Sequence, residues 1–398
     1  MDTSIFKTQS EIRDHKMPRI NGNNQYKART VIALDGGYSA VKGVSPDRVF
    51  IFPSYAKKAP EGLEVVGKVR KTDIQFRDNK TGEIWLVGES AESLMDQTDI
   101  ESTTDNSLYS RYRYDSDVFR VIMMTGMALG LWGTPEGNEI FLQTGLPAKY
   151  KETDTPKLIR ALKGEHDISI KVGQGQWTDF RFTLGEDNIG VMEQPQGTLC
   201  SAVYKNGALS ELGPSILRAN SIVLDIGFGT EDIFSVRNGY KNSHQTYVDT
   251  AMRSVFDEVI KQIQDTYNTE IKIFELQKYL KTGEIPCVDP EEFKTTYVAF
   301  AEILDQANKK LCEKSIQRLM QDYNYLSDYE YLIITGGTGE SRFEQIKTRL
   351  AGLSRLKVVP GNINTPDLPF SYSNVIGYYN MRLALLKKEF EKMTGIKE

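Results

Sequence analysis

Residues 221–232 read SIVLDIGFGTED, a short apolar run, Ile222–Leu224, followed at once by a carboxylate and a glycine-rich turn. An uninterrupted apolar run is typical of a strand covered on both faces of a sheet, and Asp225 stands where that strand ends. Gly227 and Gly229 allow the turn to adopt positive φ and to bring backbone N–H groups close to an anion. The adjacent carboxylate suits a hydrated Mg²⁺ ion. The stretch predicts a phosphate site, although a simple β-hairpin also fits these residues.

The same pattern of an apolar run, an aspartate and glycines occurs earlier in the chain, at residues 31–44, which read VIALDGGYSAVKGV. Asp35 follows the apolar run, Gly36 and Gly37 form the turn, and Tyr38 occupies the place that Phe228 has in the second copy. Two copies indicate two related halves. Each half is expected to contribute one hairpin, with the phosphates of a nucleotide between the hairpins and one carboxylate from each side near the metal.

A third glycine element lies at residues 331–340, YLIITGGTGE. An apolar strand again ends in two glycines, Gly336 and Gly337. Because glycine has no Cβ, a ligand can approach the backbone closely at such a point. The element predicts a place where a nucleoside lies against bare backbone.

The composition excludes several classes of function. The chain has 398 residues, with 49 Lys and Arg against 54 Asp and Glu, and a formal net charge of -5. Roughly two to three domains are expected for this length, and no overall basic field favours direct binding of nucleic acid. The few histidines and cysteines are scattered, which argues against a His/Cys metal site and against a serine-hydrolase triad. Any metal is therefore expected to be a hard cation held by oxygen.

The sequence predicts a cytoplasmic protein without membrane contact. Its three cysteines are an odd and sparse set, which argues for a reducing compartment. The N-terminal stretch lacks the apolar core of a secretory signal. The longest apolar stretch, Val121–Trp132, covers only about half of the ~20 residues that a membrane-spanning helix needs.

Three other segments carry structural expectations. Residues 1–29 are polar and without a sustained period, which predicts a flexible N-terminal extension. Residues 109–114 interleave aromatic and basic side chains; a base-stacking patch fits this composition, but an interface loop or surface turn is favoured in an acidic protein. Residues 291–320 are interpreted as one long helix.

Residues 191–202, VMEQPQGTLCSA, combine a strand end, a proline and a helix start. Gln196 follows the proline, and a polar side chain there can orient an attacking water. Glu193 or Gln194 could also orient the water. Alternatively, Gln196 could only cap the helix and have no catalytic role. Gln196 is the leading candidate on the pattern.

In their order along the chain, these motifs resemble those of the actin-like ATPases, with the greatest similarity to the bacterial ParM-type plasmid-segregation proteins. The resemblance runs from about Thr30 to the C-terminus. Five segments carry it: Asp35-Gly36-Gly37-Tyr38-Ser39 with Lys42, Pro195-Gln196-Gly197, Asp225-Ile226-Gly227-Phe228-Gly229-Thr230, Gly336-Gly337-Thr338 and Asn374-Val375-Ile376-Gly377. Each motif is common by itself, and the order of the five is the specific signal.

The resemblance implies an α/β, actin-like two-domain ATPase fold, made of duplicated ribonuclease H-like domains around a nucleotide cleft. Domain I is expected over residues 30–207 and 371–398, and domain II over 208–370. Asp35 and Asp225 would hold Mg²⁺ through water, Lys42 would neutralise phosphate charge, and the glycine turns would bind ATP, with GTP as the alternative nucleotide. Lys278 is a candidate on the adenosine side.

The same resemblance implies filaments that assemble with nucleotide and segregate plasmid DNA. The partners would be further copies of the chain and a DNA-binding adaptor at a plasmid centromere. A sugar or carboxylate kinase shares the fold, but no further motif supplies a base for an acceptor hydroxyl. A chaperone would need a substrate-binding domain, and only 21 residues follow Gly377. A non-polymerising scaffold stays open, and a dinucleotide oxidoreductase is disfavoured because neither hairpin reads G-x-G-x-x-G.

Overall fold

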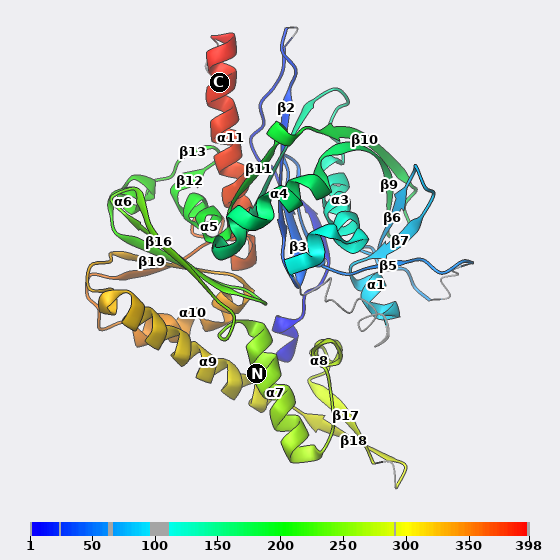
Figure 1. Ribbon diagram of the computed structural model, residues 1–398, viewed down its shortest axis with the longest axis vertical. Coiled ribbons are helices and arrows are strands. Elements are labelled where there is room, and N and C mark those ends of the chain that lie inside the picture. The colour runs from blue at the N-terminus through cyan, green and yellow to red at the C-terminus, as the bar shows by residue number, and fades with distance from the viewer. Residues whose placement is uncertain (1, 24, 63–66, 96–110, 290–291, 396–398) are drawn as a thin grey trace. The chain divides into compact units, whose positions relative to one another are not determined.

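The computed structural model describes residues 2–23, 25–62, 67–95, 111–289 and 292–395 (Figure 1). The chain divides into two compact units. Domain I consists of Gln9–Gly213 and Tyr372–Glu398, and domain II consists of Met1–Thr8 and Pro214–Ser371. The chain therefore passes from one unit to the other after Thr8 as well as near the two boundaries expected from the sequence.

The central sheet of domain I has the strand order β1-β4-β3-β2-β8-β11. Strands β2 to β4 form an antiparallel meander, and β8 and β11 continue parallel to β2. The bounds are β1 Glu11–Asp14, β2 Arg29–Gly36, β3 Ala40–Val44, β4 Arg48–Pro53, β8 Glu139–Leu146 and β11 Ile189–Glu193. Because β2, β8 and β11 run parallel, their carboxyl ends meet at one edge of the sheet.

The sheet of domain II repeats this arrangement, with the order β16-β15-β14-β19-β20. An antiparallel meander is again followed by two strands parallel to its first member. The bounds are β14 Ser221–Ile226, β15 Glu231–Arg237, β16 Tyr240–Tyr247, β19 Tyr331–Thr335 and β20 Lys357–Pro360. The predicted α/β class and duplicated design are confirmed, and the register is also equivalent, since Asp35 lies opposite Lys42 and Asp225 lies opposite Asp232.

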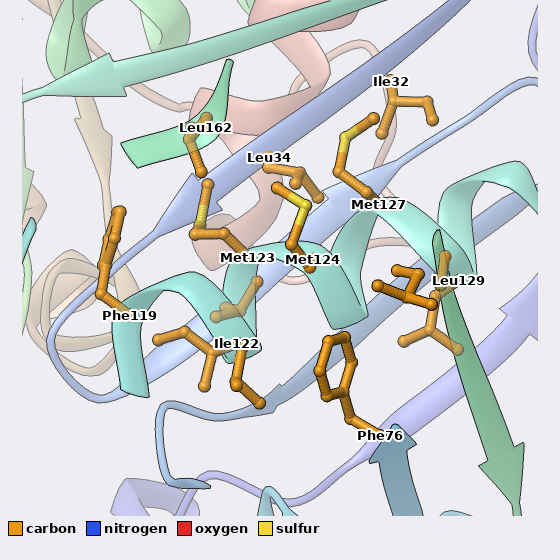
Figure 2. Close-up of a cluster of buried hydrophobic side chains, with 14 of the residues drawn as sticks. Ile32, Leu34, Phe76, Phe119, Ile122, Met123, Met124, Met127, Leu129 and Leu162 are labelled. Atoms are coloured by element: carbon orange, nitrogen blue, oxygen red, sulfur yellow. The ribbon is translucent and has the colours of Figure 1, made fainter. Parts of the chain in front are cut away.

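The core of domain I forms between the central sheet and helix α3, Asp117–Leu131. Figure 2 shows Ile32 and Leu34 of β2 beside Met124 and Met127 of α3. A second sheet, β10-β9-β6-β7-β5, joins the same core. Its strands are β5 Ala56–Lys58, β6 Ile74–Asp78, β7 Ile84–Val87, β9 Gly164–Val172 and β10 Thr178–Leu184.

The remaining helices of domain I include α1 (Glu89–Leu94), α4 (Lys151–Leu162), α5 (Gln194–Val203) and α11 (Ser373–Thr394). A Cβ atom at Gly377 of α11 would overlap the carbonyl oxygen of Gly197 in α5. Glycine at both positions therefore lets the two helix backbones touch. Within the residues described above, no helix is both long enough and apolar enough to cross a membrane.

Domain II contains α6 (Gly213–Arg218), α7 (Met252–Tyr267), α8 (Ile273–Tyr279), α9 (Ala301–Asp322) and α10 (Gly337–Arg349). The helix expected from Glu291 begins only at Ala301, and Glu291 itself lies outside the described residues. Strands β17 (Glu284–Asp289) and β18 (Lys294–Ala299) form a hairpin before it. The β-branched and aromatic run Thr295–Val298 favours a strand, which overrides the helical interpretation.

The N-terminal segment differs from the flexible extension expected from its polar composition. Strand β1 pairs antiparallel with β4, and Ile20 is buried. The hydroxyl of Tyr379 in α11 donates to the carbonyl oxygen of Pro18 over 2.6 Å. In domain II, Thr3 donates to the carbonyl oxygen of Leu280, also over 2.6 Å. The anchoring contacts come from single residues spaced along the segment, so they leave no periodic pattern in the sequence.

Candidate nucleotide site

The first glycine turn begins at Asp35, a buried residue at the end of β2. Lys42 pairs with its Oδ2 atom over 3.3 Å. Gln194 donates from Nε2 to its Oδ1 atom over 3.0 Å. Both carboxylate oxygens are therefore held, and the structure brings three polar side chains from β2, β3 and α5 to the same point.

Gln194, rather than the leading candidate Gln196, is the glutamine in contact with Asp35. Strand β11 ends at Glu193 and α5 begins at Gln194, with Pro195 in its first turn, a favourable position for proline. Two residues along a helix are turned by about 200° from one another. Gln196 therefore leaves α5 in a different direction from Gln194, and the side-chain choice depends on where the helix begins.

Arg113 forms hydrogen bonds to the carbonyl oxygens of the first glycine turn. This buried side chain lies in the 3₁₀-helix η2, Arg111–Asp115, and donates to the carbonyl oxygens of Gly36 and of Gly37, the latter over 3.0 Å. Its guanidinium also lies 4.5 Å from the ring centroid of Tyr38. In a trans peptide the C=O and the following N–H point in opposite directions. The N–H groups of Gly37 and Tyr38 therefore point away from Arg113, as an anion-binding turn requires.

This role of Arg113 was missed in the sequence, where residues 109–114 favoured an interface loop or surface turn. Tyr109 lies outside the described residues, whereas Arg113 and Tyr114 are buried. The alternation of aromatic and basic side chains was the available signal. This alternation reflects a guanidinium that packs against aromatic rings of its own domain. The ring centroid of Phe119 also lies 5.3 Å from the guanidinium carbon of Arg113.

The second glycine turn and the third glycine element form one continuous site in domain II. Strands β14 and β19 are parallel neighbours, and Asp225 lies opposite Thr335, so both strands end together. Gly336 has a φ of +84°, and a Cβ atom there would lie 2.7 Å from Oδ1 of Asp225. Thr338 donates from its hydroxyl to the carbonyl oxygen of Gly227 over 2.9 Å. This close approach of β14 to the backbone requires glycine at residue 336, and the predicted contact of a nucleoside with this backbone stays a prediction.

Helix α7 holds the second turn through its first amides. Met252 donates its N–H to the carbonyl oxygen of Gly227 over 3.2 Å, and Arg253 donates to that of Phe228 over 2.8 Å. The first amides of a helix have no partner within it, so the turn satisfies them. By the same peptide geometry, the N–H groups of Phe228 and Gly229 point away from α7.

Two predicted site residues have structural contacts of their own. The ring of Phe228 packs edge-on against Phe256 of α7, with centroids 5.9 Å apart. The ammonium of Lys278 lies 4.3 Å from the ring centroid of Phe274 within α8. The assignment of Lys278 to the adenosine side stays a prediction, as do the roles of Ser39, Gly229 and Thr230.

The donor set suits a hydrated hard cation. Asp35 and Asp225 are buried carboxylates at the ends of equivalent strands, each in its own domain. The described parts of the chain contain no group of three or more His, Cys, Asp or Glu side chains placed to bind a metal directly. Mg²⁺ keeps several of its waters in proteins and needs only one or two carboxylates, so isolated aspartates fit this metal.

The duplicated fold and the two equivalent turns are those of an actin-like fold. Residues 33–197 match the family of actin-like proteins, N-terminal domain. No curated protein sequence matches the chain significantly.

Several solved structures resemble nearly the whole chain. A non-polymerisable quadruple mutant of pCBH ParM has 21% identity and a TM-score of 0.69, covering 90% of this chain and 99% of its own. A ParM from a 15-stranded filament of Clostridium botulinum has 20% identity and a TM-score of 0.66, covering 92% and 99%. The archaeal actin homologue Ta0583 in complex with ADP has 14% identity and a TM-score of 0.58, covering 89% and 99%. The predicted resemblance to ParM-type actin-like proteins is confirmed, and at these identities it establishes the fold.

Proposed function

We propose that this protein is a nucleotide triphosphatase that assembles with ATP into cytoplasmic filaments and segregates plasmid DNA. The observation that carries the proposal is the pair of equivalent turns, each with its carbonyl oxygens held on one side and its N–H groups directed to the other. Two such turns suit the phosphates of one nucleotide. GTP stays the alternative nucleotide.

The residues divide into binding and orienting roles. Gly37 and Tyr38 of the first turn and Phe228 and Gly229 of the second would present N–H groups to phosphate. Asp35 and Asp225 would hold the waters of Mg²⁺, which supplies charge neutralisation between the β- and γ-phosphates when bound. Lys42 would add a positive charge beside Asp35, with which it pairs in the structure.

Gln194 is proposed to orient the attacking water. Its Nε2 atom donates to Asp35, so its Oε1 atom is the one that can accept a hydrogen bond from the water and orient it. Phosphoryl transfer depends mainly on positioning and electrostatic stabilisation, which a fixed amide can provide. The hydrogen bond to Asp35 supports Gln194 over Gln196 and Glu193 for this role.

Self-association and an adaptor complete the proposal. The similar ParM structures are a filament and a mutant that cannot polymerise, which supports filament assembly as the function of this fold here. The net charge of -5 gives no field that would attract DNA directly. A DNA-binding adaptor at a plasmid centromere is therefore the expected link to the cargo.

Electron microscopy and phosphate release test the proposal together. The purified chain is incubated with ATP and Mg²⁺, with ATP and a chelator, and without nucleotide. Filaments and phosphate release are expected only in the first sample. To shift the protein from almost entirely unassembled to almost entirely assembled, the nucleotide must bind the assembled state more tightly by roughly 5.5 kcal/mol of binding free energy. Absence of filaments at every protein concentration, with phosphorylation of a sugar or carboxylate, would establish the kinase instead.

A further inference from the structure

Glu231 is a fully buried carboxylate directly after the second glycine turn. It is the first residue of β15, with an exposed fraction of 0%. In the equivalent register of domain I, Val41 lies opposite Gly36, as Glu231 lies opposite Ile226. The duplicated fold therefore accepts an apolar side chain at this position, and the carboxylate has to be compensated by its surroundings.

A buried polar cluster surrounds this carboxylate. Three neighbouring side chains are also 0% exposed: Arg342 of α10, Ser315 of α9, and Thr250, which precedes α7. Burial raises the pKa of Glu231, and the facing hydroxyls of Ser315 and Thr250, with the Arg342 guanidinium, oppose that rise. Within the described residues, both Glu231 carboxylate oxygens, Arg342 Nη2 and the two hydroxyls form no hydrogen bond of ordinary geometry. Glu231 and Arg342 therefore share one buried cluster, although within the described residues no hydrogen bond joins them.

Arg342 connects three segments of domain II. Its Nε atom donates to Oδ1 of Asn308 in α9, and its Nη1 atom donates to the carbonyl oxygen of Thr250, each over 2.8 Å. Thr250 lies just before Met252, the first residue of α7, whose amide holds the carbonyl oxygen of Gly227. One turn before Arg342 in α10, Thr338 donates to that same oxygen. Both groups that hold Gly227 therefore belong to segments that Arg342 joins.

We propose that Arg342 is a positioning residue for the second glycine turn. It fixes the start of α7 against α10, so that the two donors to Gly227 keep their spacing and the N–H groups of the turn keep their direction. The proposal rests on the proposed function only in its expected effect on nucleotide affinity. The effect on the turn itself does not depend on nucleotide.

The central test replaces both charges by apolar side chains of similar size, Glu231→Leu with Arg342→Met. Replacement of buried charged groups by apolar side chains of similar volume is often neutral or stabilising, so the double variant is expected to fold with an unchanged or raised Tm. Hydrogen exchange in peptides covering residues 225–232 and 250–256 is expected to become about tenfold faster, roughly the factor carried by one hydrogen bond from a charged group. The dissociation constant for Mg·ADP should rise by a similar factor.

The matched control is Arg349→Met with Glu313→Leu. This pair also joins α10 to α9, over 3.4 Å, but at the surface, where ion pairs contribute little. Its exchange and Mg·ADP affinity should equal those of the parent. Arg342→Lys, which keeps a charge but loses the planar fork, should show an intermediate exchange rate and tests the role if the double variant does not fold.

The outcomes separate the two hypotheses. Parent-like exchange in both peptides of the folded double variant, or of Arg342→Lys, would show that the cluster is only core packing and would overturn the positioning role. If the parent itself binds no nucleotide, the proposed function fails, while faster exchange in the variant still supports the positioning role.

Discussion

The Nη1 atom of Arg113 donates to the carbonyl oxygen of Gly37 over 3.0 Å and thereby sets the direction of the first glycine turn. In the second turn, Gly227 has an equivalent constraint, because its carbonyl oxygen accepts from Thr338 over 2.9 Å and from the first amide of α7. The two turns use different donors for the same result. In both, the oxygens are occupied on one side and the N–H groups are directed to the other.

Arg113→Met should weaken nucleotide binding about tenfold or more, because two hydrogen bonds from a charged group to the first turn are lost. Arg113→Lys should fall between parent and Arg113→Met, since a lysine cannot reach both carbonyl oxygens as a planar fork does. Calorimetric titration with Mg·ADP measures both. Arg160→Met, which removes only an exposed pair with Asp115, is the control. Parent-like affinity of Arg113→Met would remove Arg113 from the site.

Gln194→Ala should slow hydrolysis by on the order of 10²-fold, about 2.7 kcal/mol of barrier, while nucleotide affinity stays close to that of the parent. The lost amide is proposed to contact Asp35 and the attacking water but no phosphate, so filaments should form and persist. Gln196→Ala, two positions along the same helix, is the matched variant and should hydrolyse at the parent rate. Phosphate release and filament lifetime are measured in the same samples. The reverse ranking of the two variants would return the role to Gln196.

Asp225→Ala should impair binding as well as turnover, because its carboxylate is proposed to hold the waters of the metal. The Mg²⁺ concentration needed for half-maximal nucleotide binding should rise by about tenfold or more, and assembly should weaken with it. Asp328→Ala, at an exposed position in the same domain, is the control. An unchanged Mg²⁺ requirement in Asp225→Ala would exclude Asp225 as a metal-holding residue.

Gly336→Ala and Gly337→Ala should differ in stability although the residues are adjacent. Gly336 has a φ of +84°, and its added methyl would overlap the carbonyl oxygen of Ile226, so a loss of at least about 2 kcal/mol is expected. Nothing lies within 4 Å of a methyl at Gly337, so its change should stay within about 0.5 kcal/mol. Denaturant unfolding of the two variants measures the difference. Equal stabilities would mean that the backbone at residue 336 is not constrained as described.

The protein alone should not bind a plasmid centromere specifically at physiological salt. Its net charge of -5 provides no field that attracts phosphate, and affinity for DNA depends strongly on such contacts. A gel shift with centromere DNA and with scrambled DNA of equal length measures this. A shift with centromere DNA only, in the absence of any adaptor, would contradict the prediction.

The sequence by itself determined the two glycine turns and the duplication of the fold. Asp35 and Asp225 each follow an apolar run and precede glycines, and this pattern is local, so it can be recognised without knowing the partners of either strand. Gly336 belongs to the same class of signal. Its positive φ and its close approach to Asp225 follow from a strand end that must pass directly into a helix.

Only the tertiary structure decided which side chains support these turns. The choice of Gln194 over Gln196 depends on the residue at which α5 begins, and that start is set by the end of β11 in a parallel sheet. Arg113 reaches the first turn from a distant segment, Arg342 of α10 joins the residue before α7, and β1 pairs with β4. Such contacts leave no periodic pattern in the sequence, because each depends on one side chain meeting a distant backbone after the domain has folded.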